Sequence, residues 1–157
     1  MIVLDTNVVS ELMRPAPSEA VLAWFAAQQA SDLYLSAIGE AELRRGAAML
    51  PEGKRRAQLI AAIDAMITED FTGRILAFDS SAAQAFVMVF LERRAAGRPI
   101  SFADCQIAAT ARAQGAAIAT RTTADLGLAI HRRFAAIGGV ELELSPREAM
   151  PAPPRLD

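Results

Sequence analysis

Two reactive side chains on which many enzymes depend are scarce in this chain. It contains a single cysteine, Cys105, and a single histidine, His131. One cysteine excludes an internal disulfide and a zinc site built from cysteines, and a small buried thiol is the role expected for it. The histidine lies in a basic, helix-like segment, which argues against a histidine-dependent catalytic triad. The sequence also lacks a glycine-rich phosphate-binding loop.

Long apolar runs are absent as well. Apolar residues make up 53% of the chain and the mean hydropathy is +0.25, but much of this is alanine. No stretch approaches the roughly 18 uncharged apolar residues that a membrane-spanning helix needs. The first residues carry no basic region and include Asp5. We therefore expect a cytoplasmic protein that has no signal peptide and no membrane contact.

Positive charge is not in excess. The net charge of −2 and the pI of about 5.5 argue against a protein held on nucleic acid by a broadly basic surface. A phosphate site remains compatible with this balance, because a metal ion bound by carboxylates reverses the local field. The basic residues form small clusters that have an ordinary interpretation as solvated helix faces: Arg44-Arg45, Lys54-Arg55-Arg56, Arg93-Arg94 with Arg98, and Arg132-Arg133.

Short apolar segments alternate with alanine-rich helical segments. The predicted strands are Ile2–Leu4, Leu33–Leu35, Arg74–Phe78, Ala117–Thr120 and Val140–Leu144. This alternation indicates a three-layer α/β/α sandwich with a mainly parallel central sheet. We expect one domain over residues 1–149 and a disordered tail over residues 150–157, where the sequence becomes rich in proline.

Capping residues, glycine and proline mark the helix boundaries. Helices are predicted to start near Val8 and to run over Ser18–Gln29, Ile38–Met49, Lys54 to about Thr68, Asp79 or Ser80 to Ala96, and Ser101 to about Gln114.

Four acidic residues are placed where such a sheet would bring them to one edge: Asp5, Glu42, Asp104 and Asp125. Ligands of open α/β sheets gather at the carboxyl ends of the strands. Each residue also has an ordinary explanation, since Asp5, Asp104 and Asp125 suit helix caps or loops and Glu42 suits a solvated helix face. Together they suggest a carboxylate pocket for a divalent metal, and so an enzyme that cleaves phosphodiesters.

Four blocks of sequence carry a family resemblance. They are Met1–Asn7 (MIVLDTN), Ala41–Gly46 (AELRRG), Phe102–Asp104 with Ile107–Ala109, and Ala119–Arg121 continued to Asp125. In this order, over residues 1 to about 144, the chain resembles PIN-domain ribonucleases, specifically the VapC-type toxins of type II toxin–antitoxin systems. The resemblance implies a PIN-like fold and an endoribonuclease that uses Mg²⁺, which Mn²⁺ can replace.

The resemblance also implies site roles. Asp5, Glu42 and Asp104 match the acidic core of the family, and Asp125 matches its more variable fourth acid. We expect metal contact from Asp5 and Asp104, while Glu42 orients or deprotonates the attacking water and Asp125 completes the shell.

Polar residues beside the acids match the family less uniformly. Thr6 and Asn7 match residues that support the first aspartate. Thr122 is a departure, because many relatives have Asn or Asp there and a hydroxyl is a poor metal ligand. Whether Asp125 reaches the metal directly or through water is therefore open.

Substrate and partners follow from the same resemblance. It implies an RNA substrate, a VapB-like antitoxin whose tail blocks the acidic pocket, and a homodimer. Arg121, Arg44 and Arg45 are the candidates for contacts to RNA phosphates. Two alternatives remain: a PIN nuclease of RNA processing without an antitoxin, and a catalytically silent PIN-like binding module.

Overall fold

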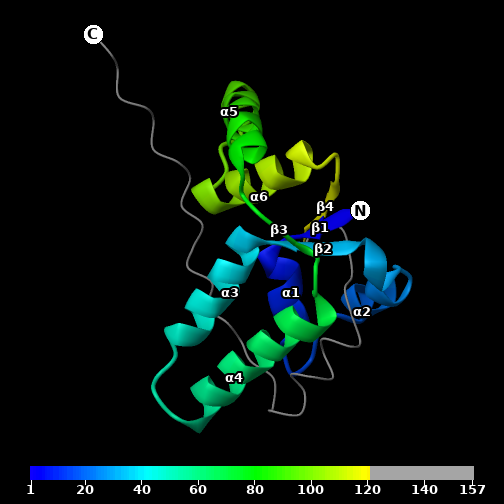
Figure 1. Ribbon diagram of the computed structural model, residues 1–157, viewed down its shortest axis with the longest axis vertical. Coiled ribbons are helices and arrows are strands. Elements are labelled where there is room, and N and C mark those ends of the chain that lie inside the picture. The colour runs from blue at the N-terminus through cyan, green and yellow to red at the C-terminus, as the bar shows by residue number, and fades with distance from the viewer. Residues whose placement is uncertain (121–157) are drawn as a thin grey trace.

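A four-stranded parallel sheet forms the centre of the computed structural model, which describes residues 1–120 (Figure 1). The strands are β1 (Ile2–Leu4), β2 (Leu33–Ser36), β3 (Ile75–Leu76) and β4 (Ala117–Ala119), in the order β3-β2-β1-β4. Leu4 of β1 pairs with Leu35 on one side and with Ala119 on the other. Because the strands are parallel, their carboxyl ends meet at one edge of the sheet.

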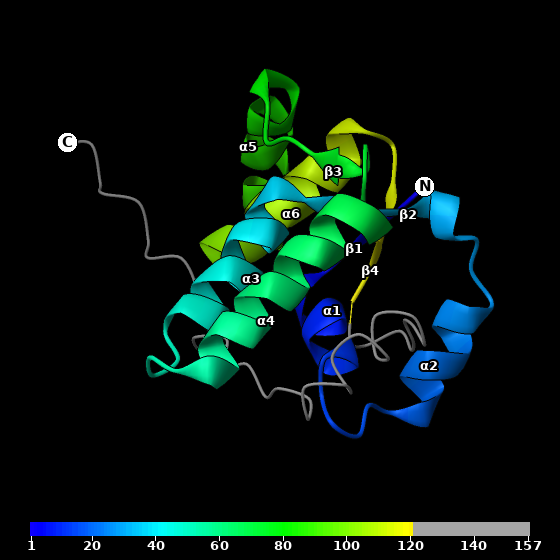
Figure 2. The ribbon, with the colours of Figure 1, turned by 60° about the horizontal axis from the view of Figure 1, so that its bottom comes forward.

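Helices cover both faces of the sheet. They are α1 (Thr6–Leu12), α2 (Glu19–Ala26), α3 (Ala37–Ala48), α4 (Lys54–Ala65), α5 (Ser80–Ala95) and α6 (Phe102–Ala113). A 3₁₀ turn, Ala30–Asp32, precedes β2, and a π-helical turn, Met66–Asp70, extends α4. Helices α5 and α6 lie on one side of the sheet, and α1, α3 and α4 on the other (Figure 1). Figure 2 shows α3 and α4 side by side as a hairpin.

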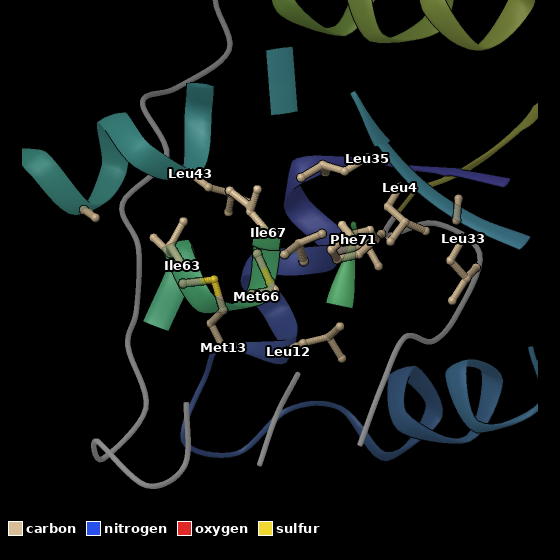
Figure 3. Close-up of a cluster of buried hydrophobic side chains, with 14 of the residues drawn as sticks. Leu4, Leu12, Met13, Leu33, Leu35, Leu43, Ile63, Met66, Ile67 and Phe71 are labelled. Carbon is tan, nitrogen blue, oxygen red and sulfur yellow. The ribbon is translucent and has the colours of Figure 1, made fainter. Parts of the chain in front are cut away.

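The two sides of the sheet have separate apolar cores. Alternate residues of a strand point to opposite faces, so Leu4 joins one core and Val3 the other. The larger core packs side chains of α1, α3, α4 and the π-helical turn against β1 and β2, with Leu43, Met66 and Phe71 fully or almost fully buried (Figure 3). The smaller core places Ile107 and Ala111 of α6 on Val3. The short central strand is thus fixed from both sides.

Capping side chains start the helices that follow the sheet. The Ser36 hydroxyl accepts a hydrogen bond from the Gly39 amide at 3.0 Å and starts α3 directly after β2. Asp79 does the same for α5 through the Ala82 amide at 2.9 Å, and this bond lowers the pKa of Asp79, with help from the Ser81 hydroxyl. Such short strand-to-helix connections keep helix N-termini close to the carboxyl edge of the sheet.

The predicted α/β/α sandwich with a parallel sheet is confirmed, with small differences at the element ends. Helix α1 starts at Thr6 and not near Val8, because Asp5 itself caps it. Strand β3 is shorter than predicted, because only Ile75 and Leu76 pair with β2. Helix α2 ends at Ala26, three residues before the predicted end. The predicted strand Val140–Leu144, the end of the domain and the tail lie outside the described residues. Within residues 1–120 no helix is both long enough and apolar enough to cross a membrane.

Candidate active site

Asp5 lies at the carboxyl end of the central strand. Its amide donates a 2.9 Å hydrogen bond to the carbonyl of Ala119, which holds the ends of β1 and β4 together. Its side chain is almost fully buried, with 7% of the residue exposed. The carboxylate accepts hydrogen bonds from the amide of Asn7 at 3.5 Å and from its side-chain nitrogen at 3.4 Å. The position of the carboxylate is therefore set by the strand register and by Asn7.

Asp104 lies in the first turn of α6. Ser101, the N-cap, accepts a 3.0 Å hydrogen bond from the Asp104 amide, and its hydroxyl donates to Oδ2 of Asp104 at 2.7 Å. Ser101 thus caps the helix and orients the carboxylate at the same time. A carboxylate in this position is further favoured by the positive end of the helix dipole.

Asp5 and Asp104 line the same cavity. The cavity has a volume of about 580 Å³ and is bounded by Asp5, Asn7, Arg93, Ile100, Asp104, Ile107, Ala108, Ile118 and Thr120. One part of its wall contains the acidic residues Asp5 and Asp104 and the side-chain amide of Asn7. Another part consists of apolar isoleucine and alanine side chains. Residues distant in sequence meet here, because they come from the end of β1, from α1, α5 and α6, and from β4.

Glu42 is tied to the same region through its neighbour in space, Thr6. The Thr6 hydroxyl donates to Oε2 of Glu42 at 2.7 Å, and Thr6 is fully buried. Gly39, one turn before Glu42, allows this approach: a Cβ there would lie 3.3 Å from the Thr6 hydroxyl and 3.0 Å from Cδ1 of Leu35. Glu42 itself is not among the residues that line the cavity. It therefore joins the site through Thr6, next to Asp5.

The oxygen ligands in the cavity suit a hard divalent cation. Within the described part of the chain, no three Asp, Glu, His or Cys side chains form a group that could hold a metal ion. Asp5 and Asp104 give the cavity two carboxylates. Mg²⁺ is usually held by one or two carboxylates and keeps several waters. The residues present therefore fit Mg²⁺ or Mn²⁺ better than a metal that needs a closed protein shell.

Comparison with known families assigns the chain to one of them. The family model described as "PIN domain" matches residues 2–124, which is most of the chain. The chain belongs to the PIN-domain family.

Relatives of this PIN domain include toxins and ribonucleases. It is 46% identical over 123 residues to VapC ribonuclease Y4jK of Sinorhizobium fredii, and 44% identical over 123 residues to Toxin FitB of Neisseria gonorrhoeae. Each match covers 78% of this chain and 88% of the relative.

Solved structures share the fold. The chain superposes with a TM-score of 0.72 and 40% identity on the crystal structure of FitAcB from Neisseria gonorrhoeae, covering 81% of this chain and 97% of that one. The chain also superposes on the structure of FitAB bound to an IR36 DNA fragment, with a TM-score of 0.73 and 37% identity. This match covers 91% of this chain and 99% of that one.

The remaining residues predicted for the site lie in different places. Arg121, Thr122 and Asp125 are outside the described residues, although Thr120, just before them, lines the cavity. The guanidinium of Arg44 binds Glu40 and Asp64 on the α3–α4 hairpin, and these carboxylates raise its pKa. The role of Arg44 in binding RNA phosphate stays a prediction, as does that of its exposed neighbour Arg45.

Cys105, beside Asp104, has no catalytic geometry. It is buried and its thiol contacts the carbonyl oxygen of Phe86 at 3.8 Å. Burial raises the pKa of the thiol, which disfavours the reactive thiolate. The role of a small buried thiol, as the sequence suggested, agrees with this environment.

Two residues of the site were missed by the sequence analysis. Arg93 was interpreted with Arg94 as part of a solvated helix face, yet it lines the cavity. The signal was its spacing, four residues after the buried Val89, which places it toward α6. Gly39 carried a signal as well, because a glycine in the first turn of a helix costs stability and so points to a close approach.

Thr6→Val should destabilise the protein and release Glu42. The substitution keeps the shape of the side chain and removes the hydroxyl, so we expect the free energy of unfolding to fall by about 1.5–3 kcal/mol, the value of a hydrogen bond to a charged partner. Urea unfolding measures the loss, and Thr6→Ser is the matched control that keeps the hydroxyl. Equal stabilities of the Val and Ser variants would contradict a structural role for the Thr6–Glu42 bond.

Proposed function

We propose that this PIN domain is a metal-dependent endoribonuclease and acts as the toxin of a toxin–antitoxin pair. The observation that carries the proposal is the cavity in which the carboxylates of Asp5 and Asp104 meet at the carboxyl edge of the sheet. Relatives named as a VapC ribonuclease and as Toxin FitB support the same activity. The substrate class that follows is RNA, cut within the chain.

Asp5 and Asp104 would hold the cation, Mg²⁺ or in its place Mn²⁺. When bound, such an ion activates water and neutralises the charge that develops on the phosphate during hydrolysis. The protein supplies the rigid placement: Asn7 fixes the carboxylate of Asp5, and Ser101 fixes that of Asp104. Fixed ligands avoid the cost of reorganisation during the reaction.

Glu42 has a separate task in this proposal. Its carboxylate, held by the Thr6 hydroxyl at 2.7 Å, orients the attacking water or accepts its proton. Asp125 is assigned as the fourth acid of the set, and Thr122 as a supporting residue. The last two assignments rest on the sequence resemblance alone.

A VapB-like antitoxin is the proposed protein partner. The similar structures include FitAB, and more distant ones sharing the fold are VapBC complexes. An antitoxin tail that enters the cavity would meet two carboxylates, so a basic side chain fits it best. Blocking the cavity in this way would prevent access of RNA.

A homodimer is the proposed assembly, and α5 offers a surface for a second copy. Val87, Met88 and Leu91 lie on one face of α5, with 54%, 51% and 53% of each residue exposed. An antiparallel, two-fold packing of α5 on its copy would bury these apolar side chains.

Purified protein should cut RNA only with the metal and the acids in place. We expect discrete fragments from total cellular RNA with Mn²⁺, and none with EDTA or in Asp104→Ala, because both treatments remove the cation from the cavity. Gel electrophoresis of the products is the measurement. A saturating amount of the cognate antitoxin should also stop the reaction.

Several results would contradict this proposal. Cleavage retained by Asp104→Ala would overturn the assigned site, and cleavage that persists with saturating antitoxin would overturn the inhibitory pairing. Intact RNA in every lane, with a partner-free sample, would favour the silent binding module.

Leu91→Lys should convert the dimer to a monomer. A charged side chain on the apolar face would have to be buried without a partner. Light scattering after gel filtration gives the mass, which should fall from twice 16.7 kDa to 16.7 kDa. Met49→Lys, at another exposed apolar residue, is the control and should stay dimeric. A wild-type protein that is monomeric at high concentration would refute the assembly.

A further inference from the structure

A cation lines the cavity together with the two carboxylates. Arg93 projects from the last turns of α5 into the wall that also contains Asp5 and Asp104. Neither the acidic pattern of the sequence nor the proposed mechanism gives this residue a task. An arginine in a carboxylate cavity is costly to hold if it serves no ligand, because arginine has a long side chain with many rotamers.

The guanidinium of Arg93 is held in place by a neutral acceptor. Its Nε donates a 3.0 Å hydrogen bond to the backbone carbonyl of Arg98, in the loop between α5 and α6. The acceptor is neutral, whereas Arg44 binds the carboxylates of Glu40 and Asp64, and Arg112 binds that of Glu92. The neutral Arg98 carbonyl therefore does not neutralise the charge of Arg93.

The walls around Arg93 make its charge effective. Ile100, Ile107, Ala108 and Ile118 line the same cavity. Apolar walls lower the local dielectric, so a phosphate that enters gains more from a fixed cation there than at the open surface. Arginine also matches the geometry of a phosphate with two parallel hydrogen bonds.

We propose that Arg93 binds the non-bridging oxygens of an RNA phosphate at or next to the bond that is cut, in the same cavity as Asp5 and Asp104. The inference rests on the proposed ribonuclease function and adds to it the residue that binds the substrate backbone. In this arrangement Asp5 and Asp104 would hold the cation, and Arg93 would bind the phosphate by charge-assisted hydrogen bonds. Its place in the cavity wall supports Arg93 as a residue that contacts RNA.

Variants of Arg93 and its neighbour Arg94 test the proposal. Arg93→Gln should lower kcat/KM for RNA cleavage by about 10- to 100-fold, the cost of a lost charged hydrogen bond. Arg93→Lys should recover part of this loss, because it restores the charge but not the two-pronged geometry. Arg94→Gln changes the same charge one residue further on, at an exposed position of α5, and should stay within about twofold of wild type.

RNA binding provides a readout that a purely structural role of Arg93 would not change. Affinity for a single-stranded RNA is measured by fluorescence anisotropy at several salt concentrations, in an Asp104→Asn background that does not cleave. Loss of one phosphate contact should reduce the slope of log affinity against log salt by about 0.7. Arg93→Gln should show this reduction and Arg94→Gln should not.

The outcomes separate this inference from the function on which it rests. Equal cleavage and equal salt slopes for the Arg93 and Arg94 variants would overturn the contact while leaving the ribonuclease intact. An unchanged slope with a lower melting temperature for Arg93→Gln would also overturn it, because Arg93 would then only hold the loop at Arg98. A wild-type protein that binds RNA without cleaving it would refute the proposed ribonuclease function. The salt slope of binding would still show whether Arg93 contacts an RNA phosphate.

Discussion

The hydrogen bond from the Asp5 amide to the Ala119 carbonyl joins the ends of two parallel strands, and the site depends on it. It fixes Asp5 beside the end of β4, where Thr120 lines the cavity. The same strand is clamped on both faces, by Leu4 in the larger core and by Val3 in the smaller one. The carboxylate of Asp5 is therefore placed by the packing of the sheet and not by the loop alone.

Three hydrogen bonds carry this rigidity from the sheet to the functional groups. Asn7 holds Asp5, Ser101 holds Asp104, and Thr6 holds Glu42. In each case a neutral donor helps to set the position of the carboxylate. Arg93 then supplies the opposite charge for the substrate. The cavity thus combines two acidic residues with an arginine, as the proposed binding of a cation and an RNA phosphate requires.

Local chemistry explains which parts of this arrangement could be predicted from the sequence. Strand Ile2–Leu4 followed by Asp5, and Ser101 followed by Asp104, are short-range patterns with strong conformational preferences, and both were found where predicted. The position of Arg93 depends on how α5 packs on α6, and the short pattern Arg93-Arg94 looks the same on a solvated helix. The Thr6–Glu42 bond joins residues 36 positions apart and needs the bare backbone of Gly39, so no local pattern shows it.

Calorimetric titration with Mn²⁺ tests most directly the claim that Asp5 and Asp104 form one cation site. Wild type, Asp5→Asn, Asp104→Asn and the surface control Asp32→Asn are compared at low salt. The account predicts binding in wild type and in Asp32→Asn, and a fall in affinity of about 10-fold or more in each of the other two, because each loses one of two carboxylate ligands. Equal affinities in all four proteins would contradict it, since the cation would then bind elsewhere.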